Sequence, residues 1–197
     1  MAQRRHHYEV ALESYLREHR IPYISVDEAR RAILPQITPL RIAAGPALKA
    51  FDFVVYGASE NLLIEVKGRR IARAGSARAR PRLECWATRD DVDSLRTWAT
   101  LFGSGFRAAL LFVYWCEEQP PDALFHETFS HKGRFYALRC IDADEYASRM
   151  RPRSPKWGTV DLSARDFEAI SHPFLHARGV SGRCDPAPFA AMEPIGA

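Results

Sequence analysis

The stretch AFDFVVYGASENLLIEVK, residues 50–67, decides the fold, because two apolar runs flank a short turn-forming segment. Both runs are rich in Val, Ile, Leu and Phe, which favours β-strands over residues 48–56 and 61–67. The four residues 57–60 (GASE) between them are typical of a tight connection. The sequence therefore predicts an antiparallel hairpin at this point of the chain.

Three charged residues interrupt the apolar runs of this hairpin: Asp52, Glu65 and Lys67. If the hairpin closes symmetrically about Ala58 and Ser59, Asp52 lies directly opposite Glu65, with roughly 5 Å between their Cβ atoms. Two carboxylates that close repel each other, and a divalent cation with oxygen ligands relieves the repulsion best. Lys67 projects from the same face, where it could hold an attacking water or offset phosphate charge. The alternative is a structural ion pair at the strand ends.

Outside the hairpin, the apolar periodicity predicts further helices and strands. Thr88 and Asp91 form a capping-box pattern, and Gly103 is placed to end the helix that follows. The predicted elements are a helix over 4–20 ended by Pro22, a strand over 23–26, a helical turn over 27–33, a proline-rich loop to residue 47, a helix over 90–102, a buried strand over 106–115, a strand over 134–141, and helices over 143–150 and 164–170.

Arginine is concentrated directly after the hairpin, in residues 68–82, which hold six arginines and no acidic residue. This segment has no apolar period and is predicted to be a mobile loop. Residues 1–82 carry 15 Lys and Arg against 8 Asp and Glu, so the net charge of +4 conceals a basic N-terminal part. Guanidinium groups bind phosphates well, which makes these side chains candidate nucleic-acid contacts. They are Arg69, Arg70, Arg73, Arg78, Arg80 and Arg82.

A second basic stretch, RPRSPKWGTV (residues 151–160), combines charge with an aromatic side chain. Trp157 could stack on a base or anchor the core, and the sequence alone favours packing. At 197 residues, with 47% hydrophobic and 26% charged residues, the chain is most simply one domain. It has no apolar run of about 18 residues and no signal-peptide pattern at its start, so we expect a cytoplasmic protein.

Several common site motifs do not occur in the sequence. The four cysteines stand far apart with no CxxC pair, which excludes the usual zinc and redox motifs and predicts free thiols. His126 and Glu127 are followed by His131 rather than by a histidine at the HExxH spacing. Neither GxxxxGK[ST] nor GxGxxG occurs. The charged hairpin is therefore the main candidate for chemistry.

The order of helix, strand, Asp strand, Glu-x-Lys strand, helix and strand, with Asp52 13 residues before Glu65, resembles the PD-(D/E)XK nuclease superfamily over about residues 6–115. Within it the spacing is similar to that of archaeal Holliday junction resolvases. The segment HYEVALE, residues 7–13, also resembles the uncharacterised bacterial family called HYExAFE. This resemblance implies an α/β, restriction-endonuclease-like αβββαβ core, with a mixed sheet flanked by helices and a C-terminal α+β extension.

The resemblance also implies roles for residues in a metal-dependent nuclease. Asp52, Glu65 and the Val66 carbonyl would bind Mg²⁺, with Mn²⁺ as a substitute, and Glu9 would complete the ligand shell. Lys67 would position the attacking water. Glu13, one turn beyond Glu9, is the alternative for the helical glutamate.

We therefore expect cleavage of nucleic-acid phosphodiester bonds, in DNA rather than RNA, by a protein compatible with a homodimer and without a membrane partner. A nucleic-acid-binding protein that does not cleave, or an intracellular interaction protein with purely structural charges, are the alternatives. The expected organisation is one nuclease-like domain over residues 1–172, with a core over 6–115 and an extension over 116–172, followed by an extended or loose tail over 173–197.

Overall fold

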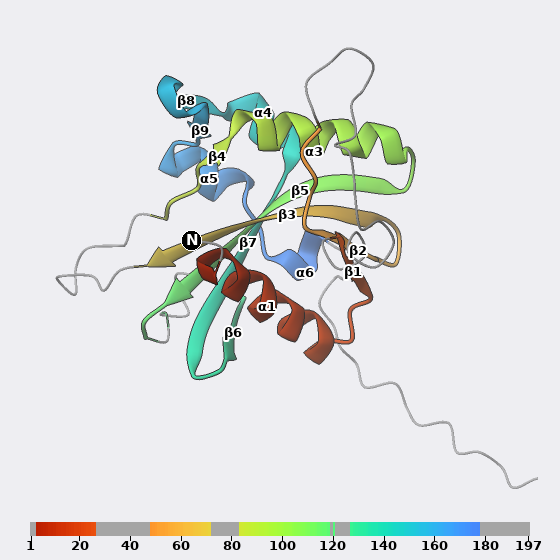
Figure 1. Ribbon diagram of the computed structural model, residues 1–197, viewed down its shortest axis with the longest axis vertical. Helices are drawn as coiled ribbons and strands as arrows, with labels where there is room; N and C mark the ends of the chain where they lie inside the picture. Colours follow the sequence, from red (N-terminus) through yellow and green to blue (C-terminus); the bar gives the residue numbers. More distant parts are fainter. Residues whose placement is uncertain (1–2, 27–47, 72–82, 119, 121–126, 178–197) are drawn as a thin grey trace, which may run out of the picture.

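The computed structural model describes residues 3–26, 48–71, 83–118, 120 and 127–177. It contains both helices and strands along this range (Figure 1). In chain order they are α1 (Gln3–Glu18), β1 (Tyr23–Ser25), β2 (Phe53–Val55), β3 (Asn61–Ile71), β4 (Ala87–Thr88), α3 (Arg89–Phe102), β5 (Phe106–Cys116), β6 (Thr128–His131), β7 (Arg134–Asp142), α4 (Ala143–Arg149), β8 (Arg151–Ser154), the 3-10 turn η1 (Pro155–Trp157), β9 (Thr159–Asp161), α5 (Ala164–Ile170) and α6 (Phe174–Ala177).

A six-stranded mixed sheet in the order β1-β2-β3-β5-β7-β6 forms the centre of the molecule. β3 and β5 run parallel over their whole lengths, from Asn61 opposite Phe106 to Ile71 opposite Cys116, and the other neighbours are antiparallel. The α-β-β-β-α-β order of α1, β1, β2, β3, α3 and β5 confirms the predicted core. The predicted extension is also present, because β7 and β6 continue the same sheet beyond β5.

Helices cover both faces of this sheet (Figure 1). On one face, Leu12 and Leu16 of α1 pack in the same cluster as Ile64 and Leu111. On the other face, α3, α4 and α5 cover the residues that alternate with these, among them Leu63, Leu110 and Phe112. β5 contributes buried residues to both clusters, which confirms the central strand expected from its continuous apolar run.

The helix after β4 begins where its capping box predicts. The Thr88 hydroxyl accepts a hydrogen bond from the Asp91 backbone N–H at 3.1 Å, and the Asp91 carboxylate accepts one from the Thr88 N–H at 3.3 Å. At the other end, Gly103 adopts φ 78° and donates its N–H to the Ala99 carbonyl. This positive φ suits glycine, which has no Cβ to clash.

A small second sheet, in the order β4-β9-β8, was not predicted. It is fixed to the core by Tyr146 of α4, whose hydroxyl donates to the carbonyls of Cys85 and Val160. Its strands are two to four residues long and carry Pro and Arg, so they lack the apolar alternation that identifies a strand in sequence.

Two predictions of where segments begin and end were wrong in part. The loop predicted over 68–82 is wrong for residues 68–71, because β3 continues to Ile71 and pairs with β5 as far as Cys116; residues 72–82 lie outside the described residues. The expected loose tail after residue 172 begins with α6 instead, where Phe174 is fully buried. The predicted helical turn over 27–33, the loop to residue 47 and the chain beyond 177 lie outside the described residues.

Cys85, Cys116 and Cys140 are buried free thiols, as predicted, and Cys184 lies outside the described residues. Among the described helices, none combines the length and the apolar character needed to cross a membrane.

Candidate functional site

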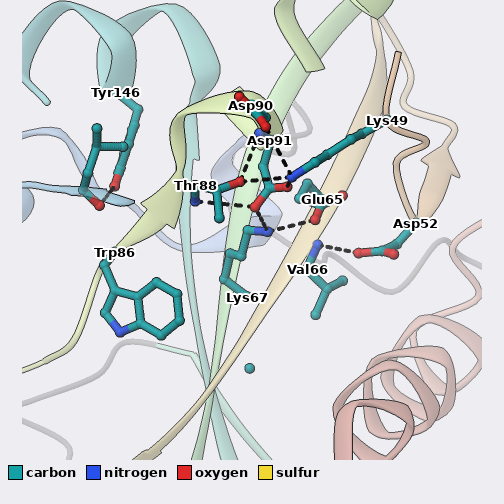
Figure 2. A network of polar contacts seen from close by, with 12 residues as sticks. Lys49, Asp52, Glu65, Val66, Lys67, Trp86, Thr88, Asp90, Asp91 and Tyr146 are labelled. Carbon is teal, nitrogen blue, oxygen red and sulfur yellow. Dashed lines mark hydrogen bonds and ion pairs between the residues drawn. The ribbon is translucent and has the colours of Figure 1, made fainter. Parts of the chain in front are cut away.

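The hairpin of β2 and β3 closes in the predicted register. Phe53 pairs with Ile64, and Val55 pairs with Leu62. Asp52 directly precedes β2 and is held against β3 twice: its N–H donates to the Ile64 carbonyl at 2.9 Å, and its Oδ2 accepts the Val66 N–H at 2.7 Å. The carboxylate of Asp52 is thereby fixed beside the segment that carries Glu65 (Figure 2).

Glu65 is a carboxylate in an unfavourable environment. Its side chain is only 15% exposed. Burial, together with the negative charge of Asp52, raises the pKa of Glu65 to about 7, although the neighbouring Lys67 opposes the rise. A proton on Glu65 near neutral pH lowers the charge of the pair, and a bound cation would do the same.

Lys67 lies on the same face of β3 as Glu65 and forms two short ion pairs. Its Nζ is 2.7 Å from Glu65 Oε1 and 2.6 Å from Asp91 Oδ2. The face is set by strand alternation, since the intervening Val66 packs on the α1 side of the sheet. Lys67 therefore links β3 to the first turn of α3, as Figure 2 shows.

Asp91 is the site residue that the sequence did not reveal as such, although its capping role was predicted. Its Oδ1 also accepts a hydrogen bond from Lys49 Nζ at 2.9 Å. Burial alone would raise the pKa of Asp91, but Lys67, with hydrogen bonds from Lys49 and Thr88, holds that pKa well below its usual range. Asp91 is therefore ionised across the whole physiological range.

Lys49 completes this network from the chain preceding β2. Its Nζ donates to the Thr88 hydroxyl at 3.1 Å, and its carbonyl accepts the Trp98 indole N–H at 2.7 Å. The cluster thus contains the carboxyl groups of Asp52, Glu65 and Asp91 and the ammonium groups of Lys49 and Lys67. It carries one net negative charge when Glu65 is ionised and none when Glu65 is protonated.

The two helical glutamates lie on α1, whose buried residues cover the other face of β3. Glu13 pairs with Arg17 at 2.8 Å. Over the described part of the chain, no three His, Cys, Asp or Glu side chains converge in a way that could hold a metal ion. The structure thus brings Asp52, Glu65 and Lys67 together but does not join Glu9 to them, and the role of Glu9 as a metal ligand stays a prediction.

Arg69 was predicted to lie in a mobile loop and contact phosphate, and the loop placement is wrong. It lies within β3, is only 8% exposed, and places its guanidinium carbon 3.9 Å from the centre of the Trp86 ring. It also donates to the carbonyls of Gly68 and Trp86. Arg69 is therefore part of the packed interior between β3 and the chain before β4.

Arg70, the next residue, is different because its side chain points to solvent and pairs with Glu117 beside the Trp115 ring. The other four arginines, Arg73, Arg78, Arg80 and Arg82, lie outside the described residues.

The donor set of the site is compatible with a hard divalent cation. Asp52 and Glu65 offer carboxylate oxygens and Val66 offers a backbone carbonyl, which are the ligand types that Mg²⁺ and Mn²⁺ take in proteins. Burial and the neighbouring Asp52 charge raise the pKa of Glu65, so a cation bound here would favour its ionised form.

Comparison with solved structures finds several chains that resemble this one. The chain is similar to Archaeoglobus fulgidus Hjc, a Holliday junction resolvase from an archaeal hyperthermophile, with 16% sequence identity and a TM-score of 0.49. The similarity covers 90% of this chain and 97% of that one. No family model and no curated protein matches the sequence, so the expected membership of the HYExAFE family is not supported by either comparison.

Proposed function

We propose that this protein is a metal-dependent nuclease that cleaves phosphodiester bonds in DNA. One observation carries the proposal: Asp52 and Glu65 are neighbours on the hairpin, and Lys67 lies beside Glu65 on the same face. Two carboxylates can hold a divalent cation, and an ammonium group beside them can offset phosphate charge, which suits metal-assisted hydrolysis of a phosphodiester. The choice of DNA over RNA follows from the resemblance of the motif spacing to junction-resolving nucleases.

Asp52, Glu65 and the Val66 carbonyl would hold Mg²⁺ or Mn²⁺, with Glu9 as a further proposed ligand. When bound, such an ion lowers the pKa of a coordinated water and stabilises charge that develops on the phosphate. Asp52 is already held in place by the Val66 N–H, so its carboxylate needs little rearrangement. Glu65 must ionise and give up its ion pair with Lys67.

Lys67 would hold the attacking water or a non-bridging phosphate oxygen with its ammonium group. Its second ion pair, to Asp91, remains when Glu65 turns away, and this pair keeps the ammonium group directed at the site. Asp91 acts through Lys67 and is therefore a positioning residue in this proposal.

The test is Mg²⁺-dependent nicking of plasmid, branched and single-stranded substrates by the wild type and by Asp52→Ala, Glu65→Gln and Lys67→Ala. All three variants should lose cleavage, and Asp52→Ala should also lose Mn²⁺ binding in a calorimetric titration. Glu60→Gln is the matched control, because Glu60 lies on the same hairpin and also forms an ion pair, with Arg107. The nuclease proposal fails if the wild type cuts no substrate and binds no divalent ion.

A second candidate is a nucleic-acid-binding protein that keeps the site without cleaving. The observation that favours it is the double ion pair of Lys67, which neutralises carboxylate charge that a metal ion would otherwise use. Salt-sensitive binding of DNA without cleavage in Mg²⁺ or Mn²⁺ would support this second candidate. A cytoplasmic location and assembly as a homodimer remain parts of the proposal.

A further inference from the structure

Trp157 is the most exposed large hydrophobic side chain among the described residues, at 71%. It was expected to pack in the core, but it ends the η1 turn between β8 and β9 and faces solvent. A tryptophan left in water forgoes the burial it would gain in the core, and its ring is accessible for stacking.

The turn that carries Trp157 is firmly fixed. Gly158, at φ 58°, donates its N–H to the Pro155 carbonyl, and its own carbonyl accepts the Arg89 N–H at 2.8 Å. Beyond it, Val160 of β9 is buried and accepts a hydrogen bond from Tyr146. The indole is therefore presented by an ordered backbone, which reduces the entropy lost when a ligand binds.

Cationic residues lie close in the chain to the exposed indole. Lys156 Nζ lies 5.6 Å from the centre of the Trp157 ring, and Arg151 and Arg153 of β8 are exposed. Residues 146–160 contain no acidic residue. Within the described part of the chain neither Arg151 nor Lys156 forms an ion pair, whereas Arg153 lies 3.7 Å from Glu84. The turn therefore presents a flat ring with Lys156 beside it, while Arg151 on β8 lies opposite Asp161 of β9.

This surface is connected to the candidate site through α3. The Arg89 N–H that binds the Trp157 turn belongs to the first residue of α3, and Asp91, two residues later, contacts Lys67. A polyanion bound at Trp157 would therefore lie next to the end of α3 that faces the site.

We propose that Trp157, Arg151 and Lys156 bind an unpaired nucleotide of the nucleic-acid substrate, with the indole stacked on the base and the cations on flanking phosphates. The proposal rests on the proposed function and names its substrate class: a strand with at least one base outside a duplex. A base inside a duplex has both faces covered by its neighbours, so only an unpaired base offers a face to the indole. An acidic protein or an anionic membrane would meet the same cations but offers no planar base to stack on the indole.

The test is binding of the full chain, in EDTA, to a labelled oligothymidine of about 20 nucleotides and to a duplex of the same length. Trp157→Ala should weaken oligothymidine binding about tenfold and duplex binding less than about twofold, whereas Trp157→Phe should keep most of the affinity. Lys156→Ala should weaken both and reduce the salt dependence by about one counterion. Leu101→Ala is the matched control, because Leu101 is also an exposed apolar residue but lies on α3. This substitution should change neither affinity.

The inference would be overturned if Trp157→Ala bound oligothymidine with the affinity of the wild type. It would also be overturned if the variant lost affinity equally for oligothymidine, duplex and anionic vesicles. The outcome is separable from that of the nuclease proposal because no metal is present. If the wild type never cleaves but Trp157→Ala still loses single-strand affinity selectively, the nuclease proposal fails and the nucleotide site stands. If the wild type cleaves but Trp157→Ala has the same affinity for oligothymidine as the wild type, the nucleotide site fails and the nuclease proposal stands.

Discussion

Lys67 and Asp91 form an ion pair of 2.6 Å that joins strand β3 to the first turn of helix α3. The same Asp91 carboxylate closes the capping box of α3 through the Thr88 N–H. One side chain thus begins a helix and orients the ammonium group of the candidate site. Substitutions at this residue should affect stability and site chemistry together.

Asp91→Asn should lower the free energy of unfolding by about 1–2 kcal/mol, because the amide can still cap the helix but no longer neutralises Lys67. It should also reduce Mg²⁺-dependent cleavage while leaving metal binding in place. Urea unfolding and nicking assays measure the two effects. Asp90→Asn is the control, since the Asp90 side chain is 79% exposed and its ion pair with Lys49 is long, at 3.9 Å. Equal effects of the two substitutions would contradict the positioning role of Asp91.

Glu65→Gln should change how stability depends on pH. A carboxyl whose pKa rises from 4.5 to about 7 on folding binds more protons in the folded state than in the unfolded state. The free energy of unfolding therefore falls as the pH rises from 4.5 to about 7. The shift corresponds to about 3 kcal/mol at most. Chemical unfolding from pH 4 to 8 should therefore show a decline in the wild type that Glu65→Gln lacks. An identical pH profile in both proteins would refute the raised pKa of Glu65.

Gly68→Ala should be strongly destabilising, because a Cβ on Gly68 would overlap the Tyr8 ring of α1. We expect a loss of about 3 kcal/mol or more, typical of overpacking against a ring. The double variant Tyr8→Ala/Gly68→Ala should recover part of this loss in denaturant unfolding. If the double variant is less stable than the sum of the two single changes implies, the clash is not the cause.

Arg69→Ala should destabilise the fold by about 2–3 kcal/mol, since it removes the stack on Trp86 and two hydrogen bonds to carbonyls. Arg70→Ala is the matched neighbour and should change stability by less than about 0.5 kcal/mol. DNA affinity measured well below the unfolding temperature should be unchanged in Arg69→Ala. A drop in affinity without a drop in stability would restore Arg69 as a phosphate contact.

The sequence predicted the parts of the site that depend on local rules. The register of Asp52 and Glu65 follows from the hairpin geometry, and the contact of Lys67 with Glu65 follows from strand alternation. The ion pair of Lys67 with Asp91 could not be predicted, because it depends on how α3 docks against β3 after the chain has left the sheet. The position of Arg69 was predicted wrongly for a similar reason. Its partner Trp86 is distant in sequence, and the residues next to Arg69 in the chain have a composition typical of a loop.

The parallel pairing of β3 with β5 has a consequence for the chain as it is made. Each residue of β3 pairs with one 45 positions later, from Asn61 with Phe106 to Ile71 with Cys116, so on the ribosome β3 is synthesised well before its partner. During that interval LLIEV is an uncovered apolar edge that could join another nascent chain. Glu65 and Lys67 are the charges that interrupt this edge, and they would limit aggregation there before they take part in any chemistry.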